Sequence, residues 1–238
     1  MDTSTSSAQK KMSVYDVLQF APLLPALPVG AALVHFVTHP RRWSAAGRVG
    51  LFAGAAAAVL NVLRWQLQRF VTPKPDYQVL RRIGDLEVRR YPRLTLAQTD
   101  VELDFDGSLD EGFDRLASYI FGKNATDQKM PMTAPVTTQH RRDGHTISFV
   151  MAPEHAAALP EPKDSRVRLY SQRARTIAAL KFTGRYDGES VREATEALLR
   201  AVHEAGLERR GEPLFAGYDA PATLPPLRRN EVWVELKR

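Results

Sequence analysis

Two segments, SLDEGFDRLASYI at residues 108–120 and SVREATEALLRAV at residues 190–202, carry the same pattern at an interval of 82 residues. In each segment a serine is followed three positions later by a glutamate, the capping box that begins many α-helices. Apolar residues then recur at helical spacing, so that Leu116 in the first segment corresponds to Leu198 in the second. The pattern predicts two equivalent helices, each capped by its serine and each with one apolar face.

The segments around these helices are typical of β-strands. Strands are predicted at residues 77–82, 86–91, 94–101, 129–136, 145–151, 167–170, 175–182, 214–220 and 231–236. Each half of the region therefore has strands, one helix and then two strands. Because one helix on half a sheet buries little apolar surface, we expect the halves to fuse. The predicted fold is an α+β domain with pseudo-two-fold symmetry: an antiparallel sheet or barrel with two helices, and a groove between the halves that could hold a ligand.

Two apolar runs precede this domain, at residues 17–37 and 43–63. Each has 21 residues, which is about the length that crosses a bilayer core. The first contains three prolines, which indicate a kinked start. The second contains Gly50, Gly54 and Ala58, at the spacing on which membrane helices pack closely. We expect a helical membrane hairpin; the alternatives are one span with an interfacial helix, a buried soluble helix and a cleaved signal peptide.

Basic residues near the two runs predict their orientation. Seven Lys or Arg residues flank the outer ends of the runs, and three lie in the connecting loop. The positive-inside rule then places both ends, and the domain that follows, on the cytoplasmic side of a membrane. The chain is expected to have an anchor region at 1–70 with membrane contact over 14–63, a stiff linker at 71–76 and a folded domain at 77–238.

Composition excludes several classes of function. The chain has no cysteine, which rules out a disulfide scaffold, a Cys-ligated zinc or iron–sulfur site and a thiol nucleophile. Its net charge is +6, but +5 of this lies in residues 1–76 and only +1 in residues 77–238. Because a nucleic-acid binder carries a basic stripe on its folded part, we expect no nucleic-acid partner.

The sequence contains no recognisable catalytic or metal-binding motif. The nucleophile elbow, the zinc-protease helix motif and the phosphate-binding loop are all missing. The acidic pair Asp110 and Glu111 lies at a helix start, where capping and the helix dipole explain it. The histidines of the domain occupy predicted loops or an exposed helix face: His140, His145, His155 and His203. We therefore predict no catalytic residues and no metal site.

Two pairs of residues are candidates for ligand binding. Met130 and Met132 lie on one face of the predicted strand 129–136. Methionines at such positions either line the wall of a pocket that holds a flat apolar ligand or pack in the ordinary hydrophobic core. Arg228 and Arg229 follow a proline-rich loop, where they either bind carboxylates of a ligand or form salt bridges with nearby acidic residues. The residues themselves leave both choices open.

Three motifs together resemble the SOUL haem-binding protein family: KMPMTAPV at 129–136, GYD at 217–219 and RRNEVW at 228–233. The resemblance covers about 160 residues, from Tyr77 to the end of the chain. It implies a duplicated α+β barrel-like domain, similar in shape to bacterial effector-binding domains. It also implies non-covalent binding of haem or another tetrapyrrole, with no dedicated axial ligand.

Carried over by position, the resemblance places the ligand beside the first helix and the loop before the final strand. The cofactor-binding residues that it implies are Arg115, Tyr119, Met130, Met132, Tyr218, Arg228 and Arg229. The resulting hypothesis is a membrane-tethered tetrapyrrole-binding protein, not an enzyme, that acts in transport, buffering or sensing. The alternatives are an enzyme acting on haem or on a hydrophobic small molecule, and a scaffold that binds a peptide or a protein partner.

Overall fold

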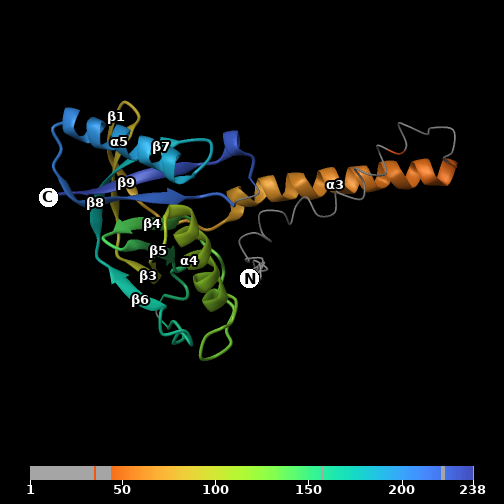
Figure 1. Cartoon of the computed structure of the whole chain (residues 1–238), viewed down its shortest axis with the longest axis horizontal. Coiled ribbons are helices and arrows are strands. Elements are labelled where there is room, and N and C mark those ends of the chain that lie inside the picture. The colour runs from red at the N-terminus through yellow and green to blue at the C-terminus, as the bar shows by residue number, and fades with distance from the viewer. Residues whose placement is uncertain (1–34, 36–43, 157, 221–222, 238) are drawn as a thin grey trace, which may run out of the picture.

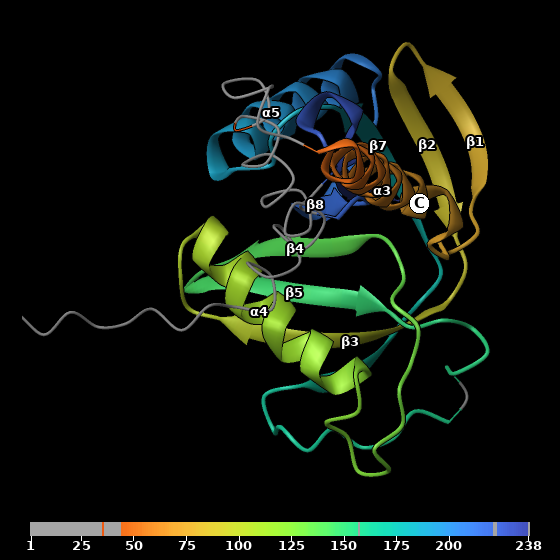
Figure 2. The same cartoon turned by 90° about the vertical axis from the view of Figure 1, so that its right-hand side faces the viewer.

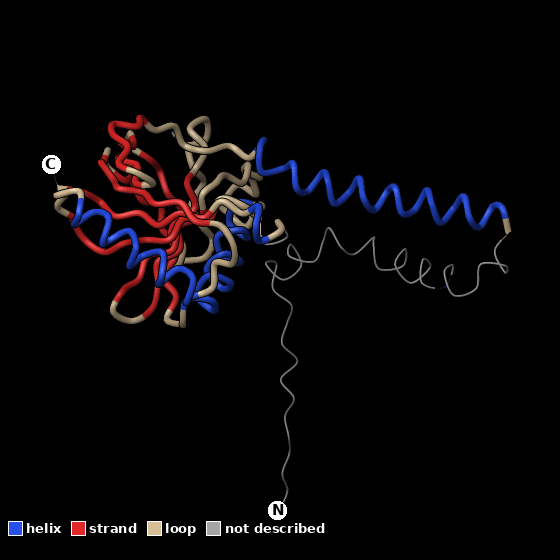
Figure 3. The backbone as a smooth tube through the Cα atoms, turned by 90° about the horizontal axis from the view of Figure 1, so that it is seen from above, coloured by secondary structure: helices blue, strands red, loops and turns tan. Residues whose placement is uncertain are grey.

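A computed structural model describes residues 35, 44–156, 158–220 and 223–237. The helices and strands, in chain order, are α3 (Ala45–Val71), β1 (Gln78–Ile83), β2 (Leu86–Tyr91), β3 (Leu94–Val101), α4 (Phe105–Ile120), β4 (Val136–Arg141), β5 (Gly144–Val150), β6 (Arg168–Gln172), β7 (Arg175–Phe182), α5 (Gly188–Glu204), β8 (Arg209–Gly217), the 3₁₀ helix η2 (Pro225–Leu227) and β9 (Asn230–Leu236). The strands gather into one body with α4 and α5, and α3 projects from its side (Figures 1 and 3).

All nine strands belong to one antiparallel sheet in the order β1-β2-β7-β9-β8-β4-β5-β3-β6. The predicted pseudo-symmetry is visible in this order, because equivalent strands lie at equal distances from the central β8–β4 pair. One strand of each half pairs with a strand of the other half: β2 of the first half with β7, and β6 of the second half with β3. This exchange makes the two halves one unit, as expected. The sheet is open rather than a closed barrel, since β1 and β6 each have one strand neighbour among the described residues.

The two predicted helices form, and each lies against its own half of the sheet (Figure 2). Each buries its apolar stripe in the core there. Helix α4 packs on β3 and β5, and α5 packs mainly on β7 and β9. Leu116 and Leu198, the residues matched in the sequence, are both fully buried. The helical part of the duplication is therefore confirmed.

The predicted helix caps are wrong by about one turn. Helix α4 begins at Phe105, where the Gly107 N–H donates to the Asp104 carboxylate (2.8 Å), and Ser108 lies buried inside the helix. Helix α5 begins at Gly188, where the Ser190 N–H donates to the Asp187 carboxylate (2.9 Å). Aspartate caps a helix as well as serine does. The aspartate that precedes each predicted segment therefore starts the helix about one turn earlier.

The strand predicted at residues 129–136 is also wrong except at its last residue. Residues 129–135 have no regular secondary structure, and β4 begins at Val136. Pro131 and Pro135 lack the N–H that a strand interior must donate. The segment instead crosses the end of α4, where the Met130 N–H donates to the Ile120 carbonyl (2.8 Å).

The structure gives no support to the predicted membrane hairpin. The run at 17–37 lies outside the described residues except for His35. The run at 43–63 falls mostly in α3, and within the described part of the chain no helix has the length and apolar character needed to cross a membrane. Arg48 and Arg64 limit the longest uncharged stretch of α3 to residues 49–63. These 15 residues span about 22 Å as a helix, short of the ~30 Å hydrocarbon core.

Helix α4 approaches the sheet most closely at Gly112. A Cβ at this position would lie 2.6 Å from Cγ1 and 2.9 Å from Cβ of Ile147 on β5. These Ile147 atoms are close to the backbone and cannot move aside easily. Glycine at 112 therefore sets the distance between α4 and the sheet.

We predict that Gly112→Ala lowers the free energy of unfolding by about 1–3 kcal/mol, because overpacking outweighs the better helix propensity of alanine. Gly188→Ala is the matched control, since a Cβ there would meet only the Phe105 Cβ at an ordinary 3.6 Å. Urea denaturation of both variants measures the difference. A Gly112→Ala variant as stable as Gly188→Ala would contradict the close approach.

Candidate functional site

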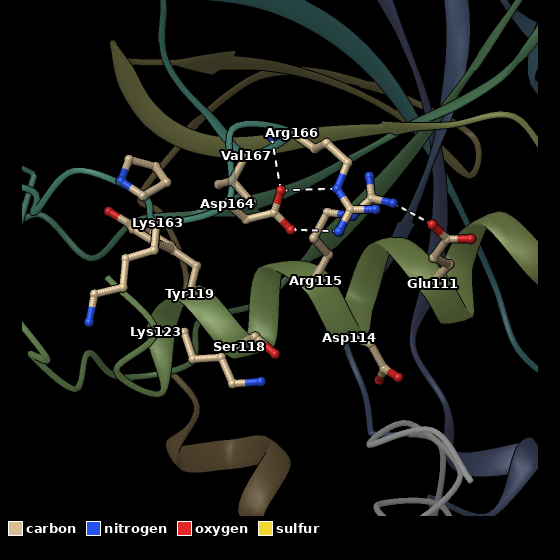
Figure 4. Close-up of a pocket in the computed structure, with 11 residues that line it drawn as sticks. Glu111, Asp114, Arg115, Ser118, Tyr119, Lys123, Lys163, Asp164, Arg166 and Val167 are labelled. Carbon is tan, nitrogen blue, oxygen red and sulfur yellow. Dashed lines mark hydrogen bonds and ion pairs between the residues drawn. The ribbon is translucent and has the colours of Figure 1, made fainter. Parts of the chain in front are cut away.

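A pocket of about 520 Å³ lies on the outer side of α4, against the segment that leads from β5 to β6 (Figure 4). It is therefore built on the first half of the domain. The sequence had instead predicted a ligand groove between the two halves. The lining residues are Glu111, Asp114, Arg115, Ser118, Tyr119, Lys123, Pro162, Lys163, Asp164, Arg166 and Val167. Tyr119 and Val167 are buried at its base, and charged side chains surround them.

Backbone carbonyls fix the outer wall of the pocket, residues 160–167, to the α4 side. The Tyr119 hydroxyl donates to the Pro160 carbonyl (2.9 Å), and the Ala125 N–H donates to the Glu161 carbonyl (2.9 Å). The Lys163 ammonium forms an ion pair with Asp127 (2.6 Å). The wall is thus held from three points, so the pocket keeps its shape without a ligand.

Asn124 holds the loop after α4 from the inside. Its side chain is fully buried and its amide donates to the carbonyls of Tyr119 (3.0 Å) and Gln128 (2.7 Å). Its amide oxygen accepts from the Gln128 N–H (3.0 Å). Sequence reasoning missed Asn124; the only sequence signal was its place just beyond the helix, after Gly122, where an asparagine often organises a turn.

Of the predicted cofactor-binding residues, Arg115 and Tyr119 lie in this pocket. The Arg115 side chain is nearly buried and donates to Thr99 Oγ1 (2.6 Å) and to the Asp100 carbonyl (3.0 Å), and it pairs with Glu111. Most of its hydrogen-bonding capacity therefore holds α4 onto β3. Burial, with a smaller effect of the Glu161 charge, raises the pKa of Tyr119 to about 12, so this phenol is neutral at physiological pH.

The cations that face the opening of the pocket come from residues that sequence reasoning did not select. Arg166 pairs through two nitrogens with Asp164 (3.0 and 2.8 Å), and its hydrogen bonds lower the pKa of that carboxyl to about 2. The Lys123 ammonium has no hydrogen bond or ion pair with the described residues. Lys123 and Lys163 both line the pocket, and in Figure 4 their ammonium groups point to different sides of it. Since Lys163 is already paired with Asp127, Lys123 is the lysine better placed to meet an anion.

Met130 and Met132 do not line this pocket. Met130 is buried in the core beneath α4 together with Phe113 and Phe149, and Met132 is half-buried against the same core. Of the two alternatives that the sequence left open, the geometry favours core packing for Met130. A binding role for either residue stays a prediction.

The late-loop candidates lie around a buried carboxylate, that of Glu231. The Arg229 guanidinium pairs with Glu231 (2.7 Å) and lies 4.0 Å from the centre of the Tyr218 ring. The Tyr218 hydroxyl also donates to Glu231 (3.3 Å). Arg228 donates to the Thr223 carbonyl (2.8 Å) and lies over the Tyr186 ring. None of the three candidates lines the pocket on α4, so the structure does not bring the predicted residues into one site.

The histidines that the structure describes form no ligand set. His140 and His145 face each other across the β4–β5 hairpin, with ring centres 5.3 Å apart. His140 and His203 are exposed as predicted, whereas His145 is half-buried and burial lowers its pKa. Across the described residues, no three His, Cys, Asp or Glu side chains are placed to hold a metal ion.

Comparison with known proteins decides the family, since the profile of the "SOUL heme-binding protein" family matches residues 72–235. The chain belongs to the SOUL family. The mouse protein named "Heme-binding protein 2" is 29% identical over 195 residues, which cover 78% of this chain and 91% of that protein. The human protein of the same name is also 29% identical, and pig "Heme-binding protein 1" is 30% identical over 148 residues. These relatives are named as binding proteins and not as enzymes.

Solved structures agree on the fold of the SOUL domain. The EcmrR C-terminal domain superposes with a TM-score of 0.51 at 13% identity, over 68% of this chain and 98% of that one. EcmrR in its DNA complex superposes with a TM-score of 0.50 at 11% identity. At such low identity the likeness concerns the fold alone, and it confirms the α+β architecture.

We predict that Glu231→Gln lowers the free energy of unfolding of the SOUL domain by about 3–5 kcal/mol, because it removes the fully buried negative charge that pairs with both Arg89 and Arg229. Glu235→Gln is the control on the same strand, since Glu235 is part-exposed and lies 3.7 Å from an exposed arginine; it should change stability by less than about 1 kcal/mol. Thermal and urea unfolding measure both. Equal effects would mean that the buried carboxylate has no special part in the fold.

Proposed function

We propose that the SOUL domain of this protein binds haem or another tetrapyrrole non-covalently in the pocket between α4 and residues 160–167. The observation that carries the proposal is the pocket's combination of a buried base, Tyr119 and Val167, with two lysines among its lining residues. Membership of the SOUL family and the names of the relatives support the same ligand class.

The residues of the pocket fit a tetrapyrrole in size and in chemistry. Ligand pockets usually measure about 300–1,000 Å³, and this one measures about 520 Å³. The apolar surfaces of Tyr119, Pro162 and Val167 suit one face of a macrocycle, while Lys123 and Lys163 suit its propionates. Haem bound there would supply its iron and its absorption spectrum, while the protein residues would hold and orient it.

The lining residues also suggest binding without a strong axial ligand. No histidine or methionine is among them, and the Tyr119 hydroxyl is buried, neutral and donating to the Pro160 carbonyl. A ligand would then be held by its ring face and its carboxylates. Such binding suits a protein that takes up and releases its tetrapyrrole, in transport, buffering or sensing.

The N-terminal region, through residues 14–63, would tether this domain to a membrane, with the domain on the cytoplasmic side. The uncharged run at 17–37 and the excess of Lys and Arg outside the connecting loop support this part of the proposal. The tether would keep the tetrapyrrole-binding pocket near a lipid surface, where such apolar ligands partition.

The two lysines that line the pocket provide one test. We predict that the double variant Lys123→Glu with Lys163→Glu binds haem at least about tenfold more weakly, because two attractions for propionates become repulsions. The double variant Lys181→Glu with Lys237→Glu is the control, since these exposed lysines lie outside the pocket. Haem titration of the full-length proteins, followed by absorbance, measures the affinities. Unchanged affinity in the pocket variant would remove this pocket as the binding site.

The histidines provide a second test. We predict that His→Ala at His140, His145, His155 or His203 leaves the Soret band of the haem complex nearly unchanged, because none of these residues lines the pocket. Absorbance spectra of the four single variants, recorded at saturating haem, measure this. Loss or a large shift of the band in any one variant would show that this histidine is an axial ligand and that the pocket has been misplaced.

A further inference from the structure

Helix α3 exposes one continuous apolar side. Val49 is 69% exposed, Phe52 61%, Val59 59% and Leu60 66%. At about 100° per residue, these four positions fall within an arc of about 100° on the helix. Leu51 and Ala58 lie on the opposite side of the helix and are only 5% and 8% exposed. A row of large, exposed apolar residues marks an interaction surface, particularly where the opposite side of the helix is buried.

The exposed side carries no charge. The other exposed residues between Val49 and Leu60 are Gly50, Ala53, Ala56 and Ala57. The first charged residue after Arg48 is Arg64. The uncharged stretch of the helix, residues 49–63, is therefore about 22 Å long, too short to cross a hydrocarbon core but long enough to lie along one.

The charges of α3 are all of one sign. Its sequence contains Arg48, Arg64 and Arg69 and no acidic residue, so basic positions bracket the apolar stretch. A second copy of the helix would bring like charges together without acidic partners to pair with them. The phosphate groups of anionic lipids offer the opposite charge over a continuous plane. Charge therefore favours a lipid surface over a second protein copy as the occupant.

We propose that α3 does not span a membrane but lies in the plane of an anionic membrane surface, with the side formed by Val49, Phe52, Val59 and Leu60 inserted. The proposal rests on the membrane part of the proposed function and adds the orientation, the inserted side and the lipid class. It makes α3, which projects from the SOUL domain (Figure 1), the element that sets the domain's position at the bilayer surface.

Depth measurements on single-cysteine variants test this orientation, and the absence of natural cysteine makes each label unique. Val49→Cys, Val59→Cys and Leu60→Cys are made in the full-length chain and labelled with an environment-sensitive fluorophore. Leu80→Cys on β1, which is 48% exposed on the domain, is the control. The labelled proteins are reconstituted with vesicles of phosphatidylcholine mixed with phosphatidylglycerol. Spin-labelled lipids with the quencher at shallow or deep positions then report the depth of each label.

An in-plane helix places the three α3 labels at one shallow depth, protected from aqueous iodide, while the label at Leu80 stays accessible to iodide. A spanning helix separates Val49 from Val59 by about 15 Å along the membrane normal, so their quenching depths would differ; that result overturns the orientation and leaves the tether intact. Iodide access to all four labels, with no protein on the vesicles, overturns the tether as well.

Vesicles of phosphatidylcholine alone should reduce the shallow quenching several-fold, and equal quenching would overturn the preference for anionic lipid.

Discussion

The buried carboxylate of Glu231 is the interaction on which the arrangement of the domain depends. It accepts two hydrogen bonds from Arg89 (2.6 and 3.1 Å), two from Arg229 (2.7 and 2.9 Å), one from Trp233 (2.7 Å) and one from the Tyr218 hydroxyl (3.3 Å). Burial alone would raise the pKa of Glu231, but these hydrogen bonds and the two guanidinium charges outweigh it and lower the pKa. A charge this deep is tolerated only because nearly every lone pair has a donor.

The position of this network explains why it matters. Arg89 lies on β2 and Glu231 on β9, and both strands flank β7. The ion pair therefore spans β7 and fixes the exchanged strand β2, which belongs to the first half by sequence and to the second half by pairing. Arg89 also pairs with Glu87 (2.8 Å), whose pKa is held at about 2: hydrogen bonds from Arg89 and Lys181 outweigh the opposing effect of burial. The fusion of the halves thus rests on buried charge as well as on apolar packing.

The motif at residues 129–136 holds parts of the fold together, in a way that its sequence does not reveal. Residues 129–136 connect two cores, because Met130 packs under α4 whereas Ala134 packs with Tyr218 and Trp233. The same segment receives the linker from α3, as the Ala134 N–H donates to the Pro73 carbonyl (2.9 Å). These contacts account for the motif without a ligand. The pocket instead draws on the end of α4 and on a long loop that carries no recognisable motif.

The sequence by itself determined the two helices, most of the strands and the duplication. Burial on one face makes apolar residues recur about once per turn in a helix and at every second residue in a strand, and this spacing can be read from the sequence. It also determined the family, through motifs that maintain the fold. Only the tertiary structure decided that the halves exchange strands, that residues 129–135 are not a strand, and that Arg229 pairs with the buried Glu231. Tertiary structure alone also brought Lys123 and Lys163, 40 positions apart, to the lining of one pocket. Such decisions depend on which distant backbone segments meet, and neither local propensity nor spacing along the chain encodes that.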